Sequence, residues 1–486
     1  MKNYLRRQLP WLLIVLFAIQ PCLDVLSFWT ERAGWSNVLT LALRMGIFAC
    51  VALCGFVLSD RKKAYFLLAG ILLALALGHV WACGQVGYDS PMTDLTNFVR
   101  VIQLPVFLLC LITFQKQNRK CYPAMQIGLL IAFGIILLVE AVSYALKIRW
   151  YTYSDGSGII GWFSNTNSQS SNLCVLLPVT LGWQLTHQPR RPALFWATAV
   201  LGVASLYFFG TRLAFLGIFA TCLGLAISIL LSCRKRWKTA LALTALALVC
   251  LGAIQASPMM RHLQIYAATQ NDRQYDLNRK LGNTDPETKA LLDKARADED
   301  AYARMTPAEQ ERIRNLLAPV YELYAADFVE IFGLEETLSI LHFSTNISDF
   351  SAVRTKKLIF AQHLMAESPL SARLFGMDLN RFYVDGRIYD VENDLHGIYY
   401  LYGIAGLSCV LALLAYFVYL IVWALKKDWR RYFTPESAGL GIAFLLCLAH
   451  IYCTCGVLRR PNASIFLAAV LFGIYEIVRL RKEESV

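Results

Sequence analysis

Long uninterrupted apolar runs constrain this chain more than any other feature of its sequence. The runs from Leu9 to Phe28 and from Gly397 to Leu425 are long enough for a helix to cross a hydrocarbon core of about 30 Å. Of the 486 residues, 57% are hydrophobic and only 16% are charged, whereas roughly a quarter of the residues in soluble domains are charged. The composition excludes an ordinary soluble enzyme. Because alternating ten-residue strand patterns are absent, it predicts helical spans and not a barrel.

The apolar windows predict an all-α polytopic integral membrane protein with about twelve transmembrane helices. We expect these spans near residues 9–29, 37–58, 64–83, 98–114, 124–146, 171–186, 193–209, 213–232, 239–256, 397–425, 438–456 and 463–480. The first run follows Arg6 and Arg7 but is too long for the core of a signal peptide. We therefore expect it to be retained as a span.

Basic residues between the spans predict the orientation. The connections on the side of the N-terminus carry 22 Lys and Arg, against six in the short connections of the other side. Because cytoplasmic connections are enriched in Lys and Arg, both termini are expected in the cytoplasm. The formal charge of +12 then reflects membrane topology, and we expect no nucleic-acid partner.

One large connection divides the chain into three parts. Residues 1–256 hold the first nine spans, residues 257–395 form an extracytoplasmic loop domain, and residues 396–486 hold the last three spans and a cytoplasmic tail. The loop carries 16 basic and 22 acidic residues. It is expected to be mostly helical, because Thr306-Pro307-Ala308-Glu309 has the form of a capping box and Asp285-Pro286-Glu287 that of a second helix start.

Ionisable residues inside the spans gather toward the predicted outer side. Asp24, Arg44, Arg100 and Glu140 all fall in the outer half or at the outer end of their helices. Charged groups are costly in the hydrocarbon region and commonly mark functional sites, although some snorkel to the headgroups or form structural ion pairs. Their shared bias predicts that the chemistry of this protein faces outward.

Three segments carry the motifs of a known family. The first is Gly161-Trp162-Phe163-Ser164-Asn165-Thr166-Asn167, which enters a span, and the second is Phe209-Gly210-Thr211-Arg212-Leu213-Ala214, a hinge between two spans. The third runs from Arg354 through Leu374-Phe375-Gly376 to Glu392-Asn393-Asp394-Leu395-His396 and Gly403-Ile404-Ala405-Gly406-Leu407. In this order, and with the large loop between the second and the end of the third, the chain resembles the O-antigen ligase and polymerase superfamily of membrane glycosyltransferases.

The resemblance implies glycan transfer from an undecaprenyl-diphosphate carrier at the outer leaflet, with no cofactor, metal or nucleotide sugar. The donor-site arginines of the family map onto Arg212, in a Thr-Arg that matches the usual Ser-Arg, and onto Arg354. A guanidinium fork suits this task because the diphosphate leaving group gains charge as the glycosidic bond breaks. Arg100, Asn165 and Asn167 are the candidate substrate-binding residues.

The sequence departs from the ligase pattern where the acceptor is activated. The ligases carry a His-Asn pair twelve residues before the Gly-x-x-Gly of the next span, and Glu392-Asn393 stands at that place, with His396 four residues later. Glu392, Asp394 or His396 could accept the proton of the acceptor hydroxyl. An acidic residue here is more similar to the polymerase and Gram-positive members.

Three functions follow as hypotheses. The favoured one is polymerisation of lipid-linked repeat units for a cell-surface polysaccharide at the bacterial cytoplasmic membrane, with membrane lipids, a flippase and a chain-length regulator as candidate partners. Ligase-type transfer of a finished glycan to another acceptor is the close alternative. The rival of a different class is a transporter or flippase, but the two halves of the membrane region show no visible similarity, and the charged groups lie outward and not at the midplane.

Overall fold

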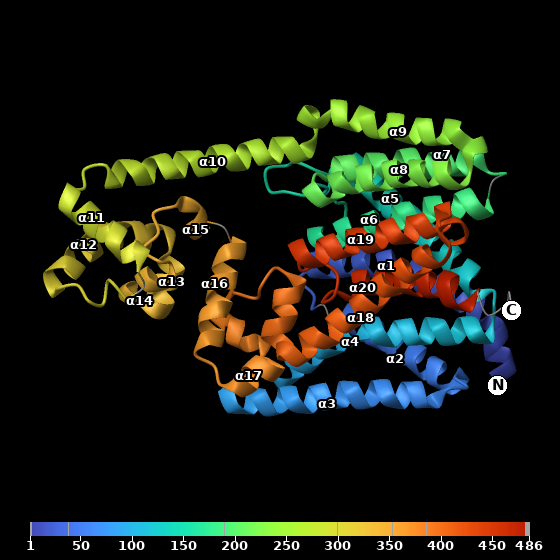
Figure 1. The fold of residues 1–486 in the computed structure, drawn as a ribbon, viewed down its shortest axis with the longest axis horizontal. Coiled ribbons are helices and arrows are strands. Elements are labelled where there is room, and N and C mark those ends of the chain that lie inside the picture. Colours follow the sequence, from blue (N-terminus) through green and yellow to red (C-terminus); the bar gives the residue numbers. More distant parts are fainter. Residues whose placement is uncertain are drawn as a thin grey trace.

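The structure is a computed structural model that describes residues 2–36, 38–188, 190–298, 300–351, 353–384 and 386–481. It is built from helices (Figure 1), with one short antiparallel pair of strands, β1 (Tyr383–Val384) and β2 (Arg387–Ile388). The predicted cytoplasmic tail beyond Arg481 lies outside the described residues.

Ten helices within the described ranges are long and apolar enough to cross a membrane, which confirms the all-α polytopic class. They are α1 (Lys2–Arg32), α2 (Val38–Leu58), α3 (Lys62–Val86), α4 (Pro91–Gln117), α5 (Cys121–Leu146), α7 (Pro192–Phe209), α8 (Arg212–Ser232), α18 (Asp394–Tyr432), α19 (Pro435–Cys453) and α20 (Pro461–Tyr475), the last extended by η4 (Glu476–Leu480).

The predicted count of twelve differs from these ten at two positions. Helices do form there, as α6 (Thr166–His187) and α9 (Trp237–Gly252, preceded by η1, Arg234–Arg236). Helix α9 has only 16 residues, or about 24 Å at 1.5 Å per residue. Helix α6 is long enough but carries many Ser, Asn, Gln and Thr residues, which a helix tolerates when other helices enclose it and keep it from lipid.

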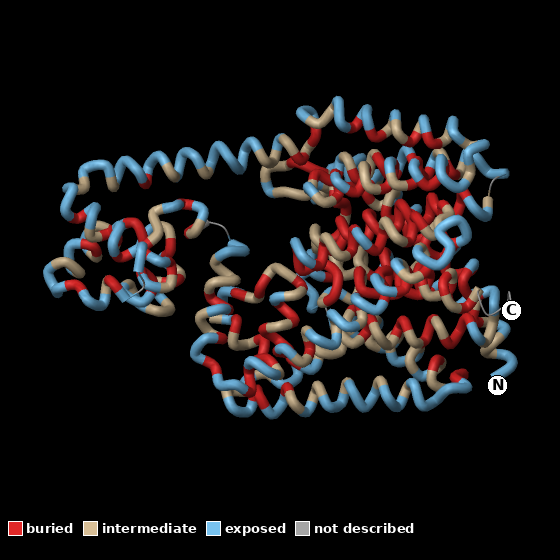
Figure 2. The backbone as a smooth tube through the Cα atoms, viewed as in Figure 1, coloured by how far each residue is buried: buried red, intermediate tan, exposed pale blue. Residues whose placement is uncertain are grey.

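Helix α6 forms the centre of the bundle and packs most closely on α19. Every residue from Ser168 to Leu185 is buried; Figure 2 shows how burial concentrates in this region. A Cβ at Gly439 would lie 2.3 Å from the Pro178 carbonyl oxygen, and one at Gly182 would lie 2.5 Å from the Pro435 carbonyl oxygen. Small residues thus let the two backbones touch, which is the usual basis of helix association in lipid.

The chain between α9 and α18, where the sequence predicts a loop domain, is mostly helical. Its elements are η2 (Ile254–Ala256), α10 (Pro258–Leu281), α11 (Pro286–Ala297), α12 (Pro307–Tyr324), α13 (Ala326–Phe332), α14 (Leu334–Ile340), α15 (Ile347–Ser351), α16 (Val353–Ala366), α17 (Leu370–Phe375) and η3 (Leu379–Phe382). The capping box of Thr306 and Glu309 is confirmed, and Asp285 caps α11 as expected. The helix that begins at this capping box ends at Tyr324, and Ala325 separates it from α13.

These loop helices lie at one end of the bundle, and both chain termini lie at the other (Figure 1). Helix α10 projects away from the bundle and carries α11–α15, whereas α16 and α17 return to it. We call the end with the loop helices the loop end. Helices α2, α4, α6, α8 and α20 begin at the loop end, so the first turns of these helices gather there.

A close backbone contact joins α17 to a break in α18. Gly403 lies within α18 but has a φ of +64°, a conformation that favours glycine. A Cβ at Gly403 would lie 2.2 Å from the Leu374 carbonyl oxygen, and a Cβ at Gly376 would lie 2.2 Å from the Leu401 carbonyl oxygen. The glycines of the Phe-Gly and Gly-x-x-Gly motifs therefore allow one contact between the loop domain and the bundle.

Replacing Gly403 by alanine is expected to destabilise the protein by about 3 kcal/mol, since the new methyl group meets backbone atoms and the positive φ is strained. The matched control is Gly441→Ala in α19, where an added Cβ meets nothing within 4 Å and alanine favours the helix by roughly 0.5–1 kcal/mol. Thermal unfolding of both variants in detergent is the measurement. Equal unfolding midpoints would contradict the contact.

Candidate functional site

The hinge between α7 and α8 presents Arg212 at the loop end. Gly210 ends α7 with a φ of +87°, and the Thr211 hydroxyl caps α8 by accepting a hydrogen bond from the Ala214 N–H at 3.2 Å. A Cβ at Gly210 would lie 3.3 Å from the Cβ of Pro258, so the start of α10 packs on this hinge. Arg212 is the first residue of α8, and its exposed side chain makes no hydrogen bond or ion pair with any described residue.

Arg354 is exposed on α16 but is held in place by neighbours. Its Nε lies 3.3 Å from Oε2 of Glu392, and its Nη1 donates to the Cys453 carbonyl at 3.3 Å. The Lys357 ammonium binds the other oxygen of Glu392 at 2.8 Å. Burial raises the pKa of Glu392, but Lys357 and Arg354 outweigh it and hold the pKa below its usual value. The carboxylate is therefore charged at neutral pH and orients Arg354.

Arg212 and Arg354 are both connected to the end of α19. Tyr153, in the segment between α5 and α6, lies next to the hinge of Arg212, since the Thr152 hydroxyl donates to the Phe209 carbonyl at 2.7 Å. Burial raises the pKa of the Tyr153 hydroxyl, and the positive charges of Arg212 and Arg354 oppose that rise. The Ser170 hydroxyl hydrogen-bonds to the Thr211 hydroxyl at 3.0 Å and to Nε2 of His450 at 3.1 Å, and Arg354 donates to the Cys453 carbonyl in the same last turn of α19. The two predicted donor-site residues thus share one region although they belong to different helices.

The three predicted proton acceptors have different surroundings. Asp394 is completely buried; its Oδ2 accepts hydrogen bonds from the backbone N–H groups of Val457 and Leu458 at 2.8 and 2.9 Å, and its Oδ1 lies 3.6 Å from Nε of Arg459. These contacts favour a structural role, which fixes the turn between α19 and α20. The His396 side chain, in contrast, is exposed and makes no hydrogen bond with a described residue.

A polar cavity of about 340 Å³ opens between the loop ends of α1, α2 and α4 and the start of α20. Its lining contains the predicted residues Arg100 and Asn165 together with Asp24, Ser27, Glu31, Thr40, Leu41, Arg44, Phe163, Ser164, Gln169, Arg460, Pro461 and Asn462. Asp24 pairs with Arg44 at 2.6 Å and accepts a hydrogen bond from Asn462 at 3.2 Å. Arg100 donates to Asn97 at 3.0 Å.

Asn165 and Asn167 position the start of α6 beside this cavity. The Asn165 side chain caps α6 by accepting a hydrogen bond from the Ser168 N–H at 2.9 Å. Asn167 packs its backbone against Gly456, where an added Cβ would lie 2.7 Å from the Asn167 carbonyl carbon. Asn165 therefore lines the cavity, whereas Asn167 anchors α6 to the turn between α19 and α20.

Arg460 is a cavity residue that the sequence motifs missed. Arg460 lines both the polar cavity and a smaller neighbouring cavity of about 120 Å³. Arg100 also lines both cavities. The smaller cavity also contains Asp390 and Arg459, which pair at 2.6 Å. The available signal was the pair Arg459-Arg460 in a connection predicted to lie outside, where the positive-inside pattern predicts few basic residues.

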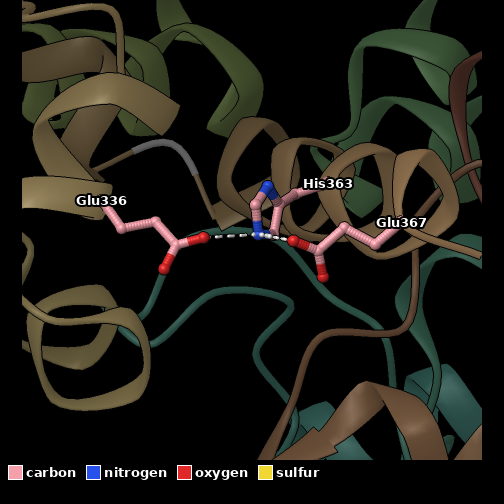
Figure 3. Close-up of side chains that lie close together, drawn as sticks. All are labelled: Glu336, His363 and Glu367. Atoms are coloured by element: carbon pink, nitrogen blue, oxygen red, sulfur yellow. Dashed lines mark ion pairs between the residues drawn. The ribbon is translucent and has the colours of Figure 1, made fainter. Parts of the chain in front are cut away.

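A separate group in the loop domain could hold a metal ion. His363 lies in the last turn of α16 and Glu367 directly follows the end of this helix; the His363 Nε2 lies 3.2 Å from Glu336 of α14 and 3.6 Å from Glu367 (Figure 3). Ligand atoms of all three residues lie within 4.8 Å of one another. The ion pair of His363 with Glu336 joins α16 to α14. None of these three residues lines the polar cavity.

A family model described as "O-antigen ligase like membrane protein" matches residues 3–483, nearly the whole chain. No curated protein matches the chain.

Replacing Asp394 by alanine is expected to destabilise the protein by about 3–5 kcal/mol, because it leaves Arg459 and two backbone N–H groups without this buried partner. The matched control is Asp390→Ala, since Asp390 is the more exposed partner of the same arginine. Folded yield and thermal unfolding in detergent measure the effect. An Asp394→Ala variant that folds normally but loses turnover would instead support the catalytic hypothesis for Asp394.

Proposed function

The chain belongs to the O-antigen ligase-like family of membrane proteins, and we propose that it polymerises undecaprenyl-diphosphate-linked oligosaccharide repeat units. Family membership supports the coarser role, glycan transfer at a membrane. The observation that carries the finer proposal is that the hinge of Arg212, through Ser170, and the Arg354 side chain are both hydrogen-bonded to the last turn of α19 at the loop end.

Two arginines with different restraints suit a diphosphate. Arg354 is oriented by Glu392 and by the Cys453 carbonyl, whereas Arg212 keeps its guanidinium donors available to a ligand. Arg212 also stands at the start of α8, where the helix dipole disfavours a cation and favours an anion. A phosphate bound there would meet a positive helix end and a guanidinium fork, which together stabilise the charge of the departing lipid diphosphate.

The neighbouring polar cavity suits the sugar part of the substrate. Its walls combine charged groups such as Arg44, Arg100 and Arg460 with the amides of Asn165 and Gln169 and the ring of Phe163. Such a mixture of hydrogen-bonding groups with an apolar surface is suited to oligosaccharides, because a sugar ring has both polar edges and apolar faces. We assign glycan binding to this cavity and lipid-diphosphate binding to the arginine pair.

The same arrangement supports an outward-facing reaction and argues against transport. The cavity is lined by residues in the last three turns of α1 and within the first three turns of α2, α4, α6 and α20, all toward the loop end. A transporter site is expected near the midplane between related halves. With the Lys-rich and Arg-rich connections placed in the cytoplasm, we propose that the loop end faces outward from the bacterial cytoplasmic membrane.

The acidic register at Glu392 favours a polymerase over a ligase. In the ligase pattern a His-Asn pair stands here, and in this chain the equivalent glutamate orients Arg354. Polymerisation also implies that donor and acceptor are both lipid-linked, so a flippase that supplies repeat units and a regulator of chain length are the partners we propose.

Purified protein mixed with undecaprenyl-diphosphate-linked repeat units, without nucleotide sugar, is expected to produce longer lipid-linked chains. Gel separation of labelled glycan measures chain length. Transfer only to a different acceptor would indicate a ligase, and movement of the lipid-linked sugar across a bilayer without transfer would indicate a flippase. The same reaction with a metal chelator tests whether a metal ion is required. We expect turnover to persist.

Arg212→Ala is expected to lower kcat/KM by roughly 10-fold to 100-fold, since a hydrogen bond to a charged group contributes about 1.5–3 kcal/mol. Arg212→Lys should be intermediate, because it keeps the charge but loses the fork. Arg261→Ala is the matched control, as Arg261 is likewise exposed and lies at the start of α10. The diphosphate role fails if folded Arg212→Ala turns over at the rate of the control.

A further inference from the structure

His262 forms an oriented pair with Asp155 next to the arginines. Its Nδ1 lies 2.8 Å from Oδ2 of Asp155, and the two side chains are 28% and 18% exposed. Neither residue belongs to the family motifs described above. They come from two segments that flank the α7–α8 hinge, one between α5 and α6 and the other at the start of α10.

Several contacts fix the imidazole in this position. The Tyr153 ring stacks on it with a centroid separation of 3.6 Å and an interplanar angle of 5°. Helix α10 is held at its start by the Ser257 cap, which accepts a hydrogen bond from the Met260 N–H at 3.2 Å, and by the packing of Pro258 on Gly210. The position of the His262 side chain is therefore set by the hinge that presents Arg212.

The hydrogen bond also sets the tautomer of a neutral His262. Burial raises the pKa of Asp155, but hydrogen bonds from Ser157 and His262 outweigh it and keep the pKa below its usual value. Asp155 is therefore an ionised carboxylate, which can only accept, so Nδ1 of His262 must carry the hydrogen. The lone pair of Nε2 is then available, and Nε2 makes no hydrogen bond within the described ranges.

We propose that His262 is the general base that activates the acceptor hydroxyl, with Asp155 as its positioning residue. The inference rests on the proposed function. The acceptor oxygen bonds to the anomeric carbon of the donor sugar, and its proton passes to Nε2 of His262. The bond from that carbon to the phosphate oxygen breaks, and the lipid diphosphate leaves with the electron pair. Solvent then takes the proton from the imidazolium.

The surroundings of the other candidates favour His262. Glu392 is engaged by Arg354 and Lys357, and Asp394 is buried against backbone N–H groups. His396 is exposed, but no carboxylate among the described residues orients its ring. The His262 ring contacts Asp155 and Tyr153. The start of α10 packs on Gly210, two residues before Arg212, so the proposed base lies beside the hinge that presents an arginine assigned to the leaving diphosphate.

The decisive variant is His262→Asn, because its side-chain amide can still donate to Asp155 but leaves no acceptor at the Nε2 position. With undecaprenyl-diphosphate-linked repeat units as substrate, kcat is expected to fall about 10²-fold to 10³-fold while KM stays within about twofold. His187→Asn is the matched control, because His187 is an exposed histidine at the far end of α6 from the loop end, and it is expected to keep kcat within about threefold of the unsubstituted protein. His396→Asn tests the competing candidate. His262→Gln serves as a second variant if His262→Asn fails to fold.

Asp155 is tested by conservative replacement. Asp155→Asn is expected to lower kcat by about tenfold or more without a matching change in KM, and Asp155→Glu is expected to restore part of it, because a carboxylate again orients the ring. A purely structural Asp155 would change unfolding temperature in both variants alike.

The outcomes separate this inference from the proposed function. If the unsubstituted protein elongates glycan and folded His262→Asn does so at a similar rate, or His396→Asn takes the large loss instead, the inference about His262 is wrong and the proposed function stands. If the protein transfers glycan only to another acceptor, the same variants are compared in that transfer, whose proton balance is identical. If no glycan transfer occurs, both proposals are overturned.

Discussion

The contact between α6 and α19 is the interaction on which the site depends. Gly182 and Gly439 let the two backbones touch, so the first turn of α6 lies beside the last turn of α19 at the loop end. Packing through small residues is effective in lipid, where no hydrophobic driving force separates helices from their surroundings. The turn that follows α19 then meets α6 through Gly456 and α18 through Asp394. The glycine contact between α6 and α19 thereby fixes the relative positions of three polar segments at the loop end: the start of α6, the turn after α19 and the start of α18.

Charged groups at the loop end differ in how completely they are paired. Fully paired groups suit a structural role, whereas an unpaired group is a candidate for ligand binding. Arg459 is enclosed between Asp390 and Asp394, and Arg44 is bound to Asp24. Leaving one such buried charge without its partner is costly, so these pairs suit anchoring. Arg212 has no such partner among the described residues and stands where the helix dipole disfavours a cation. An anionic ligand would supply the missing charge.

The sequence was informative about the membrane and less so about the environment of each polar side chain. Apolar length identified the helical class. The order of the motifs predicted Arg212 and Arg354 as donor-site residues, and hydrogen bonds connect the hinge of one and the side chain of the other to the last turn of α19. Apolar windows placed α6 but could not distinguish an enclosed helix from one that faces lipid. Asp394 and Glu392 were predicted as proton acceptors because of their position at the mouth of a span. Whether a carboxylate faces substrate or backbone N–H groups depends on the turn that packs against it, and that turn lies some 60 residues away in the chain.

The His262–Asp155 pair shows why the proposed proton acceptor is especially difficult to predict from sequence. An arginine that binds a diphosphate needs only its charge and its long side chain, so its position in a sequence motif is enough to predict it as a candidate. A histidine base needs a fixed tautomer, which depends on a partner 107 residues away and on the packing that holds the two segments together. Here the packing is that of Gly210 on Pro258, at the same hinge that ends in Arg212. The residues proposed for the leaving group and for the base therefore meet at one glycine hinge, so a movement of this hinge would displace both side chains together.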